Sequence, residues 1–197
     1  MSSMKRETDN KRERILAAAQ NCFLLYGFKR TAMDDIARAA DVSRAALYLL
    51  FPNKEAIFRT LSEQLHEATI ARVKASLQAE GPIEERLVAA FEGKYLEIMR
   101  LVQSGAHGSE LVDLNHGLGA DIAQHAERSF EDLLTEALRE AASRREIVLE
   151  RIGMDARQCA ELLNSAARGF KGRSDLALYR QQLVRLIHVF SVSLAPE

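Results

Sequence analysis

The most informative part of this chain is the stretch TAMDDIARAADVSRAALYLLFPNK, residues 31–54. Its apolar residues recur at three- and four-residue steps in two short runs, which predicts two short helices rather than strands. Asp41 stands at the turn between the runs, and Ser43 is placed to cap the second helix. A helix, a tight turn and a second helix over residues 32–51 give the spacing of a helix-turn-helix.

The second of these helices has the surface that a DNA-reading helix needs. Such a helix lies in the major groove, so its outer face must carry small or basic side chains. Here that face shows Arg44, Ala45 and Ala46, while Leu47 and Phe51 can pack inward. Arg44 is the best candidate for a base contact, because a guanidinium can bond guanine O6 and N7 together.

Residues at the helix ends around this unit are suited to binding phosphates. Thr31 and Tyr48 bring hydroxyls and Lys54 brings an ammonium group, all of which can bond phosphate oxygens. Met33 and Ser43 complete the candidate DNA-binding set. The alternative is a compact three-helix hairpin whose surface charge is incidental.

The sequence on either side predicts an all-α protein, because strong helix formers dominate and no alternating strand pattern is present. One face of the preceding helix carries Ile15, Ala19, Cys22, Phe23 and Tyr26, and Gly27 ends it. We expect Thr31 to cap the next helix, with Met33, Ile36, Ala37 and Ala40 inward. Further helices are expected at 54–81, 82–102, 120–145 and 155–169, a short or broken one at 104–119, and a last one capped by Ser174. We expect about the first eight residues to be disordered.

Composition narrows the class of protein. Residues 1–60 hold 11 Lys and Arg against 7 Asp and Glu, and the rest of the chain holds 16 against 21. A basic front end on an acidic body indicates that only the front touches a polyanion. No apolar run reaches the roughly 18–20 residues of a membrane helix, and the start lacks the apolar core of a secretory signal. Cys22 and Cys159 are too few and too far apart for a disulfide framework or a zinc motif, which favours two buried thiols in a reducing cytoplasm.

A longer pattern surrounds the helix-turn-helix. It runs Ile15-x-x-Ala18-Ala19-x-x-x-Phe23-x-x-x-Gly27, then Thr31, then Ile36-Ala37-x-x-Ala40-x-Val42-Ser43, then Leu47-Tyr48-x-x-Phe51-x-x-Lys54-Glu55-x-x-Phe58. Over about 50 residues without a gap, it resembles the N-terminal signature of the TetR family. The resemblance implies a bacterial cytoplasmic regulator, located on the nucleoid when bound to DNA. It also implies that Thr31, Tyr48 and Lys54 contact phosphates, while Arg44 and its neighbours read bases.

Three features depart from the family pattern. Asp41 replaces the usual turn glycine, but Asp tolerates left-handed backbone better than most residues. Ala46 stands where a hydroxyl residue is common, and Leu49 and Leu50 occupy positions often filled by His or Tyr. These changes remove polar reach, so affinity is expected to depend heavily on Arg44, Tyr48 and Lys54.

The resemblance divides the chain into a DNA-binding domain at 9–60 and a ligand-binding and dimerisation domain at 61–197, joined by the long fourth helix. Two apolar stripes near the C-terminus are either core or a four-helix dimer interface, and the resemblance favours the dimer. The interface candidates are Leu163, Ala166, Phe170, Tyr179, Leu183, Leu186 and Phe190. Candidates to line an inducer cavity are His66, Ile70, Phe91, Tyr95 and Met99, although most such residues are ordinary core.

The resulting hypothesis is a repressor that binds a palindromic operator as a homodimer and is released by an unknown small-molecule inducer, with no cofactor. The alternative is a DNA-binding regulator without an inducer. An enzyme is disfavoured, since no nucleophile elbow or phosphate loop is present. His107, His116 and His125, with nearby carboxylates, raise a metal site, but nine-residue spacings turn successive histidines to opposite faces of a continuous helix.

Overall fold

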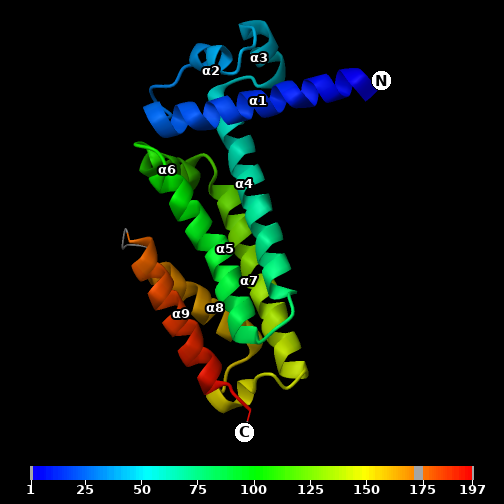
Figure 1. Cartoon of the computed structure of the whole chain (residues 1–197), viewed down its shortest axis with the longest axis vertical. Helices are drawn as coiled ribbons and strands as arrows, with labels where there is room; N and C mark the ends of the chain where they lie inside the picture. The colour runs from blue at the N-terminus through cyan, green and yellow to red at the C-terminus, as the bar shows by residue number, and fades with distance from the viewer. Residues whose placement is uncertain (1, 171–174, 197) are drawn as a thin grey trace. The chain divides into compact units, whose positions relative to one another are not determined.

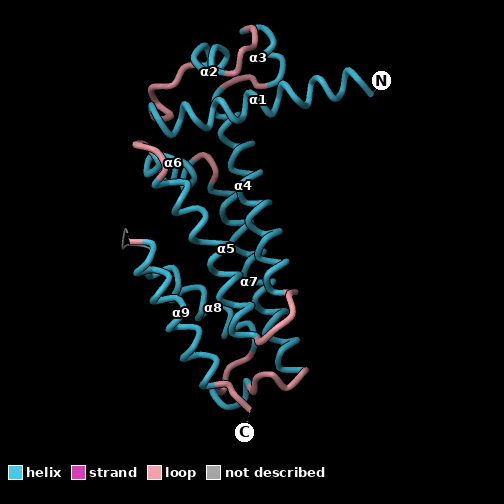
Figure 2. The backbone as a smooth tube through the Cα atoms, in the orientation of Figure 1, coloured by secondary structure: helices cyan, strands magenta, loops and turns pink. Residues whose placement is uncertain are grey.

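The computed structural model describes residues 2–170 and 175–196, and every regular element within them is a helix (Figures 1 and 2). The α-helices are α1 (Ser2–Tyr26), α2 (Met33–Ala39), α3 (Arg44–Leu50), α4 (Lys54–Leu77), α5 (Ile83–Gln103), α6 (Gly108–Gly117), α7 (Ala120–Ser143), α8 (Ala156–Gly169) and α9 (Leu176–Ser193), with a 3₁₀ turn at Leu149–Ile152. The all-α prediction is therefore confirmed. Among the helices described, none is long and apolar enough to cross a membrane.

The chain forms two compact units, which are described separately. The first contains the chain up to His66 together with Leu101–Ala123, and the second contains Glu67–Arg100 and the chain from Gln124 onward. The segment 101–123 thus packs with the N-terminal helices, although the sequence had assigned it to the C-terminal domain. No local pattern signals this, because α6 joins the first unit through contacts with residues far away in sequence.

The first unit is built around α1, α2, α3 and the start of α4. Its core gathers Ile15, Ala19, Phe23, Phe28, Ile36, Leu47, Phe51, Ile57 and Phe58. The ring of Phe28 lies 5.1 Å from that of Phe23 and 5.7 Å from that of Phe58, measured between centroids. Aromatic pairs at such distances contribute beyond their buried area. The two ring contacts of Phe28 therefore hold the α1–α2 connection against α4.

The turn of the helix-turn-helix forms as predicted. Asp41 has φ 51°, in the left-handed region. Arg14 of α1 donates to the carbonyl oxygens of Ala40 and Asp41, at 2.6 and 2.9 Å. The Ser43 hydroxyl accepts from the Ala46 N–H and caps α3.

Several sequence-based details were wrong. The residue before α2 is Ala32, whose N–H donates to the Asp35 carboxylate, so Thr31 lies one position too early to cap the helix. Tyr26 is 57% exposed, because it is the last residue of α1 and lies beyond the core. Helix α1 begins at Ser2, where disorder was expected. Ser174 lies outside the described residues, and Asp175 caps α9.

The second unit has a core of aromatic and aliphatic side chains from α5, α7, α8 and α9. Phe91, Tyr95, Phe130 and Tyr179 are each at most 1% exposed. The Phe130 ring lies edge-on to Phe91, and Tyr95 lies edge-on to Tyr179. These rings fill space between the helices of the bundle.

A polar network crosses this core. Asn164, which is 1% exposed, accepts from the Tyr95 hydroxyl at 2.5 Å and donates to Glu127 and Glu131 at 2.7 and 2.9 Å. The Lys94 ammonium pairs with Glu127 at 2.8 Å. Burial alone would raise the pKa of Glu127, but the Lys94 charge and hydrogen bonds outweigh it and lower that pKa. One amide therefore connects α5, α7 and α8.

Replacing Asn164 with alanine is expected to destabilise the protein by about 2–4 kcal/mol, because buried polar groups lose their partner. Chemical denaturation at fixed protein concentration measures the change. Arg139→Ala, which removes an exposed ion pair with Glu136 in the same unit, serves as control and should change stability by less than about 0.5 kcal/mol. Equal effects of the two substitutions would contradict the role given to Asn164.

Candidate nucleic-acid interface

Helix α3 is fixed with one face in the core and the other in solvent. Leu47 is fully buried and Phe51, directly after the helix, is 2% exposed. The opposite face carries Arg44 and Ala45, which are exposed, and Leu49, which is 86% exposed. Leu47 and Phe51 therefore lie inward and Arg44 and Ala45 outward, as the sequence predicted, whereas Ala46 is only partly exposed.

Arg44 is held by two neighbours. Its guanidinium donates to the Asp34 carboxylate of α2 at 2.8 Å and lies 5.5 Å from the centre of the Tyr48 ring. Both partners are themselves exposed, so the arginine stays accessible while its range of orientations is narrowed. The sequence did not indicate that Asp34 pairs with Arg44, since nothing local connects a residue of one helix to another ten positions along.

A groove of about 360 Å³ lies beside α3, where the α1–α2 connection meets the start of α4. It is lined by Lys29, Arg30, Thr31, Ala32, Met33, Tyr48, Pro52, Asn53, Lys54 and Glu55. Three basic residues and Tyr48 thus line a concave surface, together with one acidic residue, Glu55. Such a surface can accept a phosphate of the nucleic-acid backbone. Thr31, Met33, Tyr48 and Lys54 of the predicted set meet here; Lys29 and Arg30 were missed, although they directly precede Thr31.

Lys54 also has a structural role. Its ammonium donates to the carbonyl oxygens of Phe28, Thr31 and Lys29, at 2.8, 3.1 and 3.3 Å. It lies 4.6 Å from the centre of the Phe28 ring. The lysine therefore fixes the shape of the groove in addition to supplying charge.

Thr31 shapes the same groove from within. It is 2% exposed, and its hydroxyl donates to the Gly27 carbonyl oxygen at 2.8 Å. In this conformation the hydroxyl holds the end of α1 against the start of α2. Met33 is partly buried against the core.

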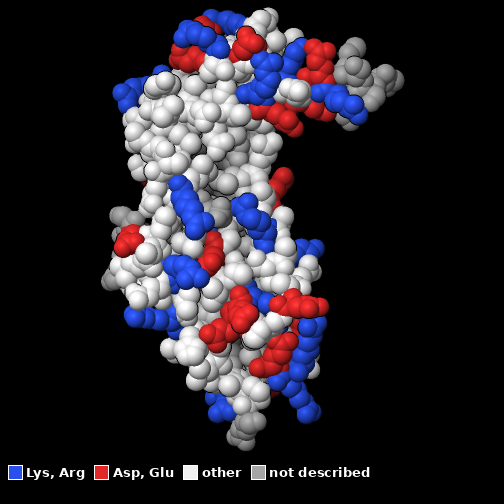
Figure 3. All heavy atoms as spheres, in the orientation of Figure 1, with Lys and Arg blue, Asp and Glu red and all other residues white. Residues whose placement is uncertain are grey.

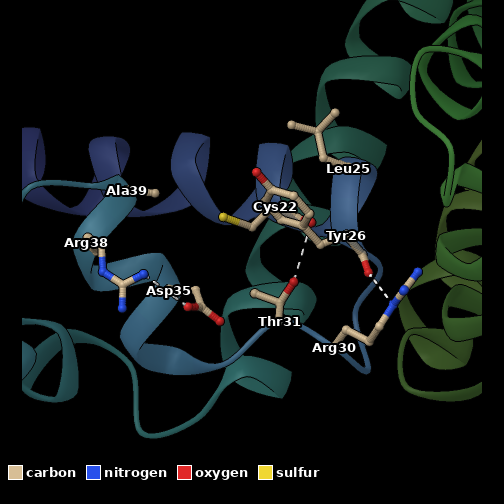
Figure 4. Close-up of a pocket in the computed structure, with 8 residues that line it drawn as sticks. All are labelled: Cys22, Leu25, Tyr26, Arg30, Thr31, Asp35, Arg38 and Ala39. Carbon is tan, nitrogen blue, oxygen red and sulfur yellow. Dashed lines mark hydrogen bonds and ion pairs between the residues drawn. The ribbon is translucent and has the colours of Figure 1, made fainter.

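A second depression, of about 590 Å³, lies between α1 and α2 (Figure 4). It is lined by Cys22, Leu25, Tyr26, Arg30, Thr31, Asp35, Arg38 and Ala39. Burial, with a smaller contribution from the Asp35 charge, raises the pKa of the Cys22 thiol. The raised pKa favours the protonated thiol, which is typical of a buried structural cysteine.

Helix α6 and the residues beside it bind the α1–α2 connection and α4 within the first unit. A ring nitrogen of His107 lies 2.8 Å from the Arg30 guanidinium, and Glu110 accepts from the Lys29 N–H at 3.1 Å. Arg59 forms two hydrogen bonds with Asp121, at 2.7 and 2.8 Å, and lowers the pKa of that carboxyl to about 2. His107 and Asp121 thus contact arginines and Glu110 contacts a backbone N–H, and no three metal-ligating groups come together in the part of the chain that the structure describes.

Charge is distributed unevenly over the first unit. Figure 3 shows Lys and Arg side chains on the N-terminal helices, with acidic side chains among them. Two of the acidic side chains, Asp34 and Asp41, are paired with Arg44 and Arg14. Pairing reduces their repulsion toward an approaching polyanion.

The candidate inducer residues do not all fall in one unit. Phe91 and Tyr95 belong to the core of the second unit, with Ile70 and Met99 packed against it. His66 belongs to the first unit, where the Asn115 amide lies 3.3 Å from its ring. The sequence could not separate these cases, because each residue occupies an equivalent position on an apolar helix face.

The dimer candidates fall into two groups by burial within the single chain. Leu163, Tyr179 and Leu183 are at most 1% exposed and Phe190 is 8% exposed within the single chain, so their side chains fill its own core. Ala166, Phe170 and Leu186 are only partly buried. The large apolar side chains that α8 and α9 expose are Leu162, Val189 and Val192, at 53, 67 and 60%. The apolar stripes in the sequence mixed core residues with surface residues, because residues of the two kinds lie next to each other along the same helices.

Known proteins with related sequences and folds define the class. Residues 15–61 match the family model described as bacterial regulatory proteins, TetR family. HTH-type transcriptional regulator TtgR of Pseudomonas putida is 38% identical over 72 residues, which cover 36% of this chain and 34% of TtgR. The chain thus aligns with about a third of the length of that relative.

Two further proteins match over more of their length. Nucleoid occlusion factor SlmA of Vibrio campbellii is 34% identical over 138 residues, covering 66% of this chain and 68% of SlmA. SmeT, the repressor of the Stenotrophomonas maltophilia multidrug efflux pump SmeDEF, shares the fold with a TM-score of 0.71 at 20% identity, covering 94% of this chain and 91% of SmeT.

These matches identify a protein of the helix-turn-helix regulator class. The chain belongs to the TetR family of transcriptional regulators.

Replacing Arg44 should alter base discrimination more than replacing its partner Asp34. Arg44→Ala is expected to cost about 1–3 kcal/mol and to relax preference at one base position. Asp34→Ala should relax the same position less, since the arginine remains but is no longer held. Binding to sequence libraries by each variant gives the measurement.

Asp41→Asn is the matched control, because it also removes one negative charge near α3 and Asn tolerates the left-handed backbone of the turn. It should leave base preference unchanged. An identical change of preference in Asp34→Ala and Asp41→Asn would show that charge alone, and not the orientation of Arg44, is responsible.

Proposed function

We propose that this protein is a transcriptional repressor that binds double-stranded operator DNA as a homodimer and is released by a small molecule. The observation that carries DNA binding is the groove of Lys29, Arg30, Tyr48 and Lys54 beside α3. A phosphate in that groove would position the helix, and Arg44 would extend from α3 toward a guanine edge. The groove would thus contact phosphates, and the adjacent face of α3 would contact bases.

The homodimer is supported by the exposed apolar surface of α8 and α9. These two helices lie against each other (Figure 1), and their outer residues Leu162, Val189 and Val192 leave apolar area in water. Exposed apolar patches mark interaction sites, and a second copy is the partner that a palindromic operator requires. Two recognition helices must lie about 34–36 Å apart to enter successive major grooves.

Binding of a small molecule is supported by the second unit. Burial raises the pKa of Tyr179, so this residue is a neutral phenol. Its hydroxyl is buried and has no hydrogen-bond partner among the described residues. A ligand with an acceptor atom would satisfy it, at a position next to Tyr95. SmeT, which shares this fold, is known in a complex with triclosan.

Coupling between ligand and operator follows from linkage. A ligand that binds more tightly to a conformation with mis-spaced recognition helices lowers operator affinity by its differential affinity. The same ligand must then bind less tightly to the operator complex. A regulator without an inducer would show neither effect.

The test of DNA binding is a selection of genomic fragments by the purified protein at two salt concentrations, read by sequencing. We expect a palindromic site whose affinity falls steeply with salt, since each neutralised phosphate releases counterions. Lys54→Ala should weaken binding to all sequences alike. Binding that is absent, or indifferent to sequence, would contradict the proposal.

The test of the dimer is Val189→Glu, which places a charge in the exposed face of α9 without disturbing the core. Sedimentation should show a monomer where the parent chain is a dimer, and operator affinity should fall at low protein concentration. Leu25→Glu, at an apolar side chain on α1 that is 57% exposed, should stay dimeric. If the Val189→Glu protein stays dimeric, the dimer interface does not include this face of α9.

A further inference from the structure

Helix α3 has an unusual chemical surface for reading DNA. Its sequence is RAALYLL, so Arg44 and Tyr48 are the only side chains in it that can form hydrogen bonds. The remaining exposed surface is hydrocarbon. Hydrogen-bond reading of bases by this helix is therefore limited to two side chains, and any further sequence information must come from apolar contacts.

Leu49 dominates that hydrocarbon surface. It is 86% exposed, which makes it the most exposed large apolar side chain in the described chain. Leu47, two residues before it, is fully buried, so the core fixes the rotation of α3 and points Leu49 to solvent. The core thus gives no reason for a leucine at position 49.

Two small residues extend the surface of Leu49. Ala45 and Ala46 precede it by four and three residues and so share its side of the helix. Ala45 is exposed and Ala46 partly so. We call these three residues the methyl face. It lies beside Arg44 on the same short helix.

We propose that the methyl face reads the C5-methyl group of thymine in the major groove, an inference that rests on the proposed operator binding. Thymine is the one base that presents a hydrocarbon group there. Adenine and cytosine present amino groups in the same groove, and a leucine against an amino group would leave a donor without water or acceptor. The preferred half-site therefore contains thymine close to the guanine contacted by Arg44.

Spacing along the helix limits where that thymine lies. Leu49 follows Arg44 by five residues, which is roughly 7.5 Å at 1.5 Å per residue. Successive base pairs are separated by about 3.4 Å. The thymine is expected within about three base pairs of the guanine.

The surroundings favour DNA over a second protein copy as the occupant of the methyl face. Tyr48 belongs both to α3 and to the groove of Lys29, Arg30 and Lys54. A polyanion bound in that groove brings its bases to the adjacent helix face. Charge complementarity next to the face thus points to nucleic acid.

The experiment replaces thymine with deoxyuridine at each position of the selected operator, which removes only the methyl group. Replacing the thymine under Leu49 should weaken binding about fourfold per half-site. The Leu49→Ala variant should bind the thymine operator more weakly than the parent chain does. It should bind the uracil operator nearly as tightly as it binds the thymine operator. Because Leu49 is exposed, its removal should leave thermal stability unchanged, which a melting curve checks.

Leu25→Ala is the matched control, since Leu25 is an exposed leucine of the same unit on α1 rather than α3. It should retain the full difference between thymine and uracil operators. A parent protein that selects a palindrome but ignores the methyl group overturns the thymine reading and leaves the proposed function intact. The reading is also overturned if Leu49→Ala still discriminates thymine from uracil. Absence of any sequence-specific binding overturns both.

Discussion

The DNA-binding unit depends on the hydrogen bonds that the ammonium group of Lys54 donates. This group binds three backbone carbonyl oxygens of the α1–α2 connection, those of Phe28, Lys29 and Thr31, from the first residue of α4. Each of those carbonyls would otherwise need water or another donor. Because the Phe28 ring packs on Phe58 of α4 at the same place, the ion and the aromatic contact fix the entry into α2 together. The helix-turn-helix is thereby positioned relative to the helix that follows it.

This arrangement separates residues that fix the fold from residues that we propose carry specificity. Lys54 and Thr31 are bound into the fold, so a change at either alters the groove itself. Arg44 and Leu49 project from α3 into solvent, and the core contacts of that helix come from Leu47. Sequence preference can therefore vary at Arg44 and Leu49 without disturbing the packing of the unit. The proposed phosphate contacts involve Lys54 and Thr31, so the affinity that they contribute cannot change without altering the groove.

The helix-turn-helix could be predicted because its signals are local. Asp41 tolerates left-handed backbone, Ser43 caps the next helix, and the apolar spacing identifies the buried faces. The pairing of Asp34 with Arg44 and the packing of residues 101–123 with the N-terminal helices depend on tertiary structure, which no periodicity encodes. The dimer candidates show a related limit. An apolar stripe wide enough for a core and an interface does not show which of its edges, Leu163 or Leu162, the core takes.

The chemistry of α3 has a consequence for how specificity and salt are related. Contacts to phosphates weaken as salt rises, whereas burial of a methyl group does not involve ion release. A recognition helix with one cation and a hydrocarbon face thus places its discrimination mainly in terms that salt leaves unchanged. Rising salt then lowers affinity for all DNA more than it lowers the ratio between operator and other sequences. Specificity in this protein is therefore expected to persist under conditions where overall binding is weak.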